Sequence, residues 1–100
     1  MDSETRVRPE GSAIILHPDD NVATALCDLA CGTTLTLPDG TVLQTIEAIP
    51  FGYKVALRAI DAGEHVLKYG VPIGVAVWGI SRGEKIHTHN LRTLQGGAVT

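Results

Sequence analysis

A seven-residue pattern occurs twice in the second half of the chain. Residues 60–66 read IDAGEHV and residues 80–86 read ISRGEKI, so Ile-x-x-Gly-Glu-x-(Val/Ile) recurs at an offset of 20 residues. In each copy, polar residues and a glycine typical of a turn precede a short β-type segment. Two copies are too few for a solenoid. We therefore expect two similar loop-and-strand units that fold against each other and give pseudo-symmetric β structure.

Other segments also favour short strands. Residues 33–49 (TTLTLPDGTVLQTIEAI) contain two β-forming stretches around Pro-Asp-Gly, which predicts a hairpin because proline presets the bend and glycine tolerates positive φ. Residues 12–17 (SAIILH) and 54–60 (KVALRAI) predict further strands. Pro72 cannot donate to a strand ladder and predicts an edge position for its segment.

One helix is expected, over residues 17–32 (HPDDNVATALCDLACG). Asp19 or Asp20 can accept hydrogen bonds from the first turn, the apolar residues recur at helical spacing, and Gly32 can adopt the left-handed conformation that ends a helix. The expected fold class is therefore mainly β with one short helix.

Length and composition indicate a single globular domain. The chain has 100 residues, of which 44% are hydrophobic and 19% charged, and its net charge of -3 argues against a nucleic-acid partner. No apolar run approaches the ~20 residues that span a membrane, and the polar N-terminus is unlike a signal peptide. Both observations favour a cytoplasmic location. Residues 12–94 form the expected domain, between flexible tails at 1–11 and 95–100.

Three further residues have simple structural readings. Cys27 and Cys31 are expected to be small buried side chains, with a metal or redox role as the alternative. Trp78 is expected in the core rather than as a stacking platform.

The sequence HTHN at residues 87–90 is the first candidate site. On a strand, His87 and His89 would lie about 7 Å apart on one face and could reach one metal ion or one anion. The alternative is that both are ordinary strand histidines held by hydrogen bonds.

Other polar residues allow both functional and structural readings. His17, beside two aspartates, could bind an anion or simply pack over the following turn. Lys68 and Tyr69, before a glycine, could bind a carboxylate or form a turn. Glu64 and Glu84 are most simply turn residues that accept backbone hydrogen bonds.

Four segments, in this order, resemble the N-terminal SAF domain of the altronate and galactarate dehydratase family of sugar-acid hydro-lyases. They are HPDDNVATAL, IPFGYKVAL, KYGVPIG and HTHN. The family shows His-Pro-x-Asp-Asn-Val-Ala, Ile-Pro-x-Gly-His-Lys-Val-Ala-Leu, Lys-Tyr-Gly-x-x-Ile-Gly and His-x-His-Asn. The resemblance covers residues 13–93, roughly, and is specific because four motifs recur with similar spacing.

The resemblance implies a β-clip fold of twisted hairpins and a large catalytic dehydratase subunit as partner. It implies a sugar-acid or hydroxy-acid substrate and a divalent metal, Fe or Mn, held mainly by that subunit. His87 and His89 would be catalytic or would bind the metal. The remaining residues expected to face substrate or partner are His17, Asp20, Asn21, Lys54, Lys68, Tyr69 and Asn90.

One position departs from the family pattern. Tyr53 stands where the family usually has histidine, while Lys54 is retained. A phenol has a pKa near 10, against about 6.5 for imidazole, so Tyr53 would be a poor base at neutral pH but could still donate a hydrogen bond.

Three alternatives to an altronate-type small subunit stay open. The chain could be a sulfolactate sulfo-lyase small subunit, a freestanding SAF module that binds a sugar acid or a protein, or a structural domain whose site was lost with Tyr53. A homo-oligomer through exposed strand edges is also conceivable.

Overall fold

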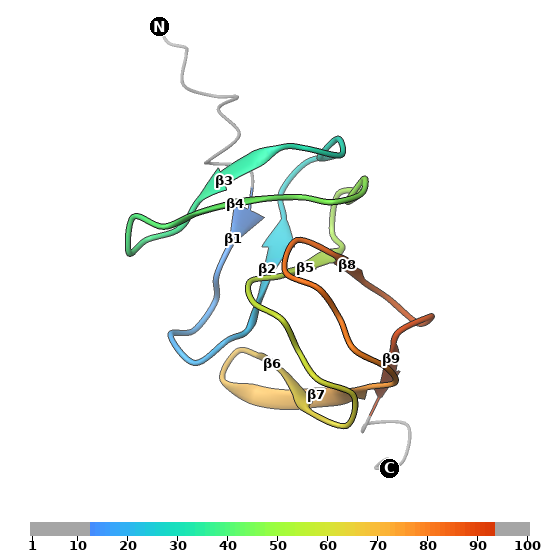
Figure 1. Ribbon diagram of the computed structural model, residues 1–100. Coiled ribbons are helices and arrows are strands. Elements are labelled where there is room, and N and C mark those ends of the chain that lie inside the picture. Colours follow the sequence, from blue (N-terminus) through green and yellow to red (C-terminus); the bar gives the residue numbers. More distant parts are fainter. Residues whose placement is uncertain (1–12, 94–100) are drawn as a thin grey trace, which may run out of the picture.

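The computed structural model describes residues 13–93, which form nine short strands (Figure 1). The tails predicted at residues 1–11 and 95–100 lie outside the described residues. In chain order the strands are β1 (Ala13–Ile14), β2 (Val22–Ala25), β3 (Thr34–Thr36), β4 (Val42–Gln44), β5 (Lys54–Ala56), β6 (His65–Lys68), β7 (Val71–Ala76), β8 (Lys85–Ile86) and β9 (Leu91–Thr93).

The strands form three antiparallel sheets. The central sheet has the order β1-β2-β5-β8, with the β3–β4 hairpin at one end of the molecule and the β6-β7-β9 sheet at the other (Figure 1). The mainly β prediction is confirmed, and hairpins folded back on a central sheet agree with a β-clip architecture. No helix among residues 13–93 is long and apolar enough to cross a membrane.

The predicted hairpin around Pro-Asp-Gly is confirmed. β3 and β4 pair with Leu35 opposite Leu43. Gly40 has a φ of 91°, and the Asp39 carboxylate accepts hydrogen bonds from the backbone N–H and hydroxyl of Thr41 at 2.9 and 2.7 Å. The turn therefore uses glycine for its positive φ, as predicted, and the Asp39 side chain adds hydrogen bonds that the prediction did not include.

The repeat is also confirmed, but the structure contains four copies of its turn rather than two. In each copy, a glycine with positive φ lies three residues after a buried Leu or Ile. The glycines are Gly32 (84°), Gly52 (86°), Gly63 (84°) and Gly83 (87°). The apolar residues meet in two isolated bridges, Leu29 with Ile49 and Ile60 with Ile80. The first two copies lack glutamate after the glycine, which is why the sequence pattern did not include them.

The same backbone hydrogen bonds hold all four copies. The residue after the glycine donates its N–H to the carbonyl two residues before the glycine, at 2.9–3.2 Å. Each glycine N–H donates to a carbonyl in a neighbouring segment at 2.8–2.9 Å; the acceptors, in chain order of the glycines, are Thr45, Ala25, Ala76 and Ala56. A β-turn with a left-handed third residue requires glycine, so glycine is the constant element of the repeat.

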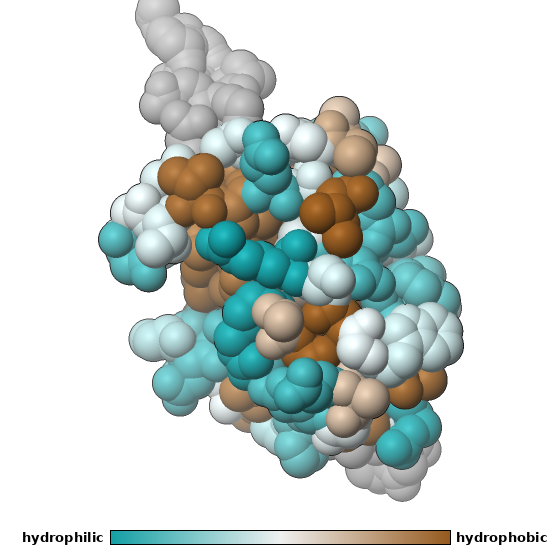
Figure 2. Space-filling model, viewed as in Figure 1, coloured by the Kyte–Doolittle hydropathy of each residue, from teal (hydrophilic) through white to brown (hydrophobic). Residues whose placement is uncertain are grey.

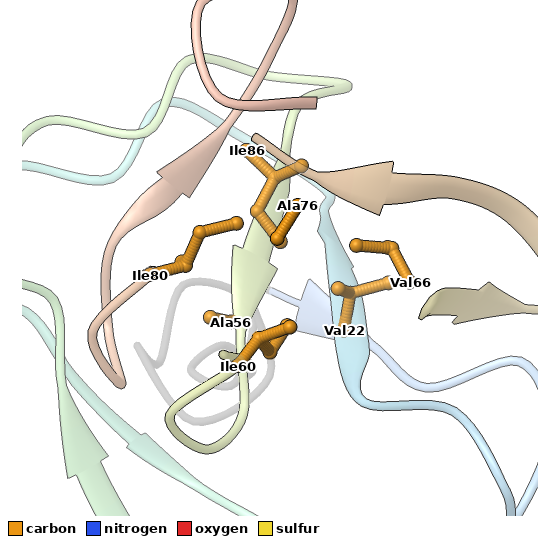
Figure 3. Packing of buried hydrophobic residues seen from close by; sticks show 7 residues of the cluster. All are labelled: Val22, Ala56, Ile60, Val66, Ala76, Ile80 and Ile86. Carbon is orange, nitrogen blue, oxygen red and sulfur yellow. The ribbon is translucent and has the colours of Figure 1, made fainter. Parts of the chain in front are cut away.

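Two hydrophobic clusters cover the two faces of the central sheet. Because side chains alternate along a strand, Val22 joins one cluster and Ala23 the other. The first consists of Val22, Ala56, Ile60, Val66, Ala76, Ile80 and Ile86 (Figure 3). The second consists of Ala23, Ala25, Leu29, Leu35, Leu43, Ile49 and Val55. Each cluster contains one of the two bridges, so each pair of repeat copies has its own core.

The helix predicted over residues 17–32 is wrong. The segment instead forms a turn, β2, and the bridge at Leu29, and no helix occurs within residues 13–93. Because β2 is covered on both faces, Val22, Ala23 and Ala25 are all buried, and such an apolar run cannot be distinguished from a buried helix by periodicity. Gly32 does have positive φ, but it ends a bridged turn.

The edge position expected for the segment of Pro72 is also wrong, because β7 as a whole pairs with both β6 and β9, although Pro72 itself is paired only with β6. Pro72 lies opposite Leu67, next to a register irregularity, and the pairing with β9 begins only at Gly74. The missing N–H of Pro72 therefore removes no bond to β9.

Several residues expected inside lie on the surface. Cys27 and Cys31 are exposed free thiols, and Trp78 is 50% exposed. Apolar and polar side chains alternate across the face drawn in Figure 2. The exposed large apolar side chains are Ile14, Leu26, Val42, Ile46, Phe51, Tyr69, Val71, Val77 and Trp78.

Candidate functional site

Residues 87–90 form a turn between β8 and β9, not the strand that the His-x-His spacing suggested. Asn90 is completely buried beneath this turn. Its side-chain oxygen accepts a hydrogen bond from the His87 N–H at 2.9 Å, and its amide donates to the Lys85 carbonyl at 2.8 Å. Asn90 therefore fixes the turn from inside, and His87 and His89 are both exposed at its surface.

The two histidine rings lie against different aromatic side chains. His87 lies 4.7 Å from Tyr53 and His89 lies 6.4 Å from Trp78, measured between ring centroids. Within residues 13–93, no group of three or more His, Cys, Asp or Glu side chains is placed to hold a metal ion. The two imidazoles alone do not make a complete ligand set for a metal ion.

His87 lines a shallow pocket at the end of the β5–β8 pair. The other lining residues are Gly52, Tyr53, Lys54 and Ile86. A phenol and an imidazole thus meet at one pocket, which can donate hydrogen bonds to an anionic group.

Lys85 adds an ammonium group beside this pocket, with its Nζ 5.4 Å from the centroid of the Tyr53 ring. Tyr53 and Lys85 were not among the predicted site residues. Their positions in the repeat could have identified them. Tyr53 follows the glycine of the second repeat copy, and Lys85 occupies in the fourth copy the position that Lys54 occupies in the second.

Lys54 is half-buried, and burial lowers the pKa of its ammonium group below 10.5, helped by repulsion from Lys68. Lys68 ends β6 and lies 5.6 Å over the ring of Tyr69. The structure therefore brings together two predicted site residues that are 14 positions apart in the sequence.

The predicted residues His17, Asp20 and Tyr69 meet at the turn after β6. The buried Asp20 carboxylate accepts hydrogen bonds from the backbone N–H groups of Tyr69 (3.1 Å) and Gly70 (2.8 Å). Tyr69 has a φ of 60°, a left-handed conformation that tyrosine rarely adopts. The His17 ring packs on Gly70 so closely that a Cβ there would lie 2.8 Å from it. Asp20 thus holds a strained turn and leaves the Tyr69 side chain exposed.

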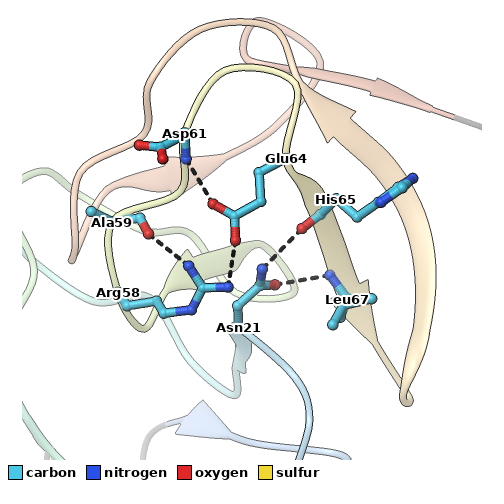
Figure 4. Close-up of polar contacts among 7 residues, drawn as sticks. All are labelled: Asn21, Arg58, Ala59, Asp61, Glu64, His65 and Leu67. Atoms are coloured by element: carbon cyan, nitrogen blue, oxygen red, sulfur yellow. Dashed lines mark hydrogen bonds and ion pairs between the residues drawn. The ribbon is translucent and has the colours of Figure 1, made fainter.

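Asn21 connects β2 to β6 (Figure 4). Its amide donates to the His65 carbonyl at 3.0 Å and its oxygen accepts from the Leu67 N–H at 2.8 Å. Both bonds are made beside the β6 irregularity between Val66 and Leu67. The buried Asn21 side chain therefore uses its hydrogen-bonding groups to hold the fold together, as do those of Asp20 and Asn90.

The predicted turn roles of the two glutamates are confirmed. Glu64 accepts a hydrogen bond from the Asp61 N–H at 2.9 Å and Glu84 accepts from the Ser81 N–H at 2.8 Å. Glu64 also pairs with Arg58 at 2.6 Å (Figure 4), and these hydrogen bonds lower the pKa of its carboxyl group below 4.5, the Arg58 bond most.

The fold and the pocket define a small β domain that presents cationic and aromatic side chains on its surface. The chain belongs to the altronate/galactarate dehydratase SAF domain family, whose pattern matches residues 11–94. The resemblance inferred from the four sequence motifs is therefore confirmed.

The known proteins that resemble the chain include sugar-acid dehydratases and a sulfo-lyase subunit. Altronate dehydratase of Escherichia coli strain K12 is 45% identical over 80 residues, and galactarate dehydratase (L-threo-forming) of the same strain is 42% identical over 78. These matches cover 80% and 78% of this chain but 16% and 14% of the two relatives. The (2R)-sulfolactate sulfo-lyase subunit alpha of Chromohalobacter salexigens is 47% identical over 47 residues, which is 47% of this chain and 50% of that subunit.

Proposed function

We propose that this chain is the small subunit of a hydroxy-acid hydro-lyase of the altronate dehydratase type and works with a larger catalytic subunit. The main support is that the 80 matched residues make up only 16% of altronate dehydratase, so an enzyme of this type needs a much larger catalytic part than this domain. The match to a protein named as a subunit alpha supports a separate small chain.

In this proposal, the pocket between Tyr53 and His87 faces the active site of the large subunit. The elimination removes the proton α to the substrate carboxylate, while the hydroxyl group on the neighbouring carbon leaves as water. A histidine at pH 7 can accept or donate a proton, so His87 or His89 would act as acid or base, or would orient the carboxylate. A divalent metal, Fe or Mn, would be held mainly by the large subunit and would polarise the substrate.

Recovery of the tagged chain from extracts of its own cells tests this proposal. We expect a larger chain to co-purify in stoichiometric amounts, with dehydratase activity on altronate or galactarate in the presence of Fe or Mn. His87→Ala and His89→Ala should abolish activity but not recovery of the complex. His65→Ala is the matched control, because His65 is exposed on β6.

A chain that is recovered alone and inactive would contradict the proposal and favour a freestanding binding module. Full activity in both His87→Ala and His89→Ala complexes would instead favour a purely structural domain.

The match to sulfolactate sulfo-lyase subunit alpha favours (2R)-sulfolactate as a second candidate substrate. The same eluate should be assayed for release of sulfite from (2R)-sulfolactate. Sulfite release without activity on altronate or galactarate would assign the complex to the sulfo-lyase type.

A further inference from the structure

A second group of polar side chains lies on the opposite face of the central sheet from Tyr53 and Lys85. In the β2–β5–β8 register, Thr24 lies directly opposite Lys54, and Lys54 lies opposite Ile86. Directly paired residues share a face of an antiparallel sheet. Thr24 and Lys54 thus lie on the face that carries the first hydrophobic cluster.

β6 packs on the same face, because its Val66 belongs to that cluster together with Ile86. Lys68 follows Val66 by two residues on this strand. Burial, and after it repulsion from Lys68, lowers the pKa of the half-buried Lys54, as expected for two ammonium groups on the same side of the central sheet. Two like charges gathered there destabilise the chain unless an anion lies between them.

No such anion is provided by the described part of the chain. Ion pairs within residues 13–93 join His17 to Asp19 and Arg58 to Glu64, and neither involves Lys54 or Lys68. The Asp20 carboxylate next to the Lys68 turn accepts hydrogen bonds from backbone N–H groups instead.

The hydroxyl of Thr24 is a third unsatisfied group in this region. Its oxygen is buried and has no hydrogen-bond partner among the described residues. A buried hydroxyl without a partner costs about 1–3 kcal/mol, so such groups in native proteins commonly have a role that the protein atoms alone do not show. Here the hydroxyl lies across the strand pair from Lys54, which has no counter-ion among residues 13–93.

We propose that Lys54, Lys68 and the Thr24 hydroxyl form an oxyanion site whose ligand is a carboxylate of the hydroxy-acid substrate. Two ammonium groups and a hydroxyl supply donors to a carboxylate, and the ligand neutralises the repulsion between the lysines. The identity of the ligand rests on the function proposed above, whereas the oxyanion site rests on the arrangement of these three residues.

The chain contains three lysines, so a lysine-labelled sample gives three side-chain Cε–Hε signals that report separately on each face. Galactarate is the probe, and galactitol, in which both carboxylates are replaced by neutral hydroxymethyl groups, is its control. We expect galactarate to shift the Lys54 and Lys68 signals saturably and to leave Lys85 unchanged. Galactitol should shift none.

Matched variants test the three donors. Lys54→Met, Lys68→Met and Thr24→Val should each weaken galactarate binding about tenfold or more, since each removes a hydrogen bond to a charged group. Arg92→Gln, which removes an exposed positive charge on β9, should not. Amide spectra establish that each variant is folded.

The proposal is overturned if galactitol binds as tightly as galactarate, or if Lys85 shifts in place of Lys54. Inorganic phosphate that binds as tightly as galactarate would overturn the assignment to a carboxylate. These titrations use the chain alone. Failure to recover a large subunit would therefore refute the proposed function but not the oxyanion site. Absence of galactarate binding would refute the oxyanion site but not the proposed function.

Discussion

The two halves of the molecule use the same turn but use the residue after its glycine differently. In the half built on the Ile60–Ile80 bridge, this residue is Glu64 or Glu84, and each carboxylate binds a backbone N–H of its own turn. In the half built on the Leu29–Ile49 bridge, the second turn has Tyr53, whose ring contacts His87.

Pro50 explains this difference. The N–H that Glu64 and Glu84 bind belongs to the residue two positions before the glycine, which is Asp61 or Ser81. At Gly52 that residue is Pro50, which has no N–H to bind. No acceptor is needed at position 53, so Tyr53 is available for the pocket. The candidate site thus lies where the repeat departs from its own pattern.

The largest expected effect comes from Gly83→Ala compared with Gly63→Ala. Both glycines have left-handed φ, but a Cβ at Gly83 would lie 2.3 Å from the backbone oxygen of Gln44, whereas a Cβ at Gly63 would meet open space. We expect a loss of about 1 kcal/mol for Gly63→Ala and about 3 kcal/mol or more for Gly83→Ala. Urea denaturation measures both, and equal losses would contradict the packing account of Gly83.

The next largest effect is expected from the loss of turn closure, the hydrogen bond from the Ser81 N–H to the Glu84 carboxylate. Glu84→Ala should cost about 1 kcal/mol, because the Ser81 N–H loses its partner. Tyr53→Glu should gain nothing from turn closure, since Pro50 lacks an N–H. The double variant Pro50→Ala, Tyr53→Glu should recover part of that closure relative to Pro50→Ala alone. A stabilising Tyr53→Glu single variant would refute the role assigned to Pro50.

A smaller effect is expected in acid. Because the folded pKa of Glu64 is lowered, its contribution to stability is present above its unfolded pKa and is lost as pH falls through the folded value. Arg58→Gln removes the main cause and should move the Glu64 pKa back toward 4.5 in an NMR titration. The Arg58–Glu64 pair is exposed, so stability near pH 7 should change by less than about 1 kcal/mol. An unchanged Glu64 pKa in Arg58→Gln would contradict this assignment.

The smallest effect separates Lys54 from its repeat equivalent Lys85. Because the folded pKa of Lys54 is lowered, the unfolded chain holds more protons at this residue between that pKa and 10.5, and stability rises with pH across this window. Lys54→Met should therefore slightly stabilise the free chain at neutral pH and flatten this rise. Lys85→Met should do neither. Thermal unfolding at pH 7 and at alkaline pH measures both, and destabilisation by Lys54→Met would contradict the strain assigned to the lysine pair.

Sequence reasoning succeeded where the local chemistry of a turn dictates the residue. Pro-Asp-Gly predicted the β3–β4 hairpin, and the spacing of glycine and isoleucine predicted the second pair of repeat turns. It failed for residues 17–32, because burial of β2 on both faces imitates the apolar content of a helix. It also failed for the His-x-His segment, where the buried Asn90 holds a turn between two strands.

The glycine-dependent turns, the mainly β class and the family all follow from the amino-acid sequence alone. These depend on residue types that only certain backbone conformations accept, or on motifs preserved in order along the chain. Which side chains meet depends instead on how the strands pair in three dimensions. Asp20 finds its hydrogen-bond donors at Tyr69 and Gly70, and Lys54 shares its surroundings with Lys68, because strand pairing joins segments far apart in the chain. Such pairings depend on sheet register and on burial from both faces, which no local pattern encodes.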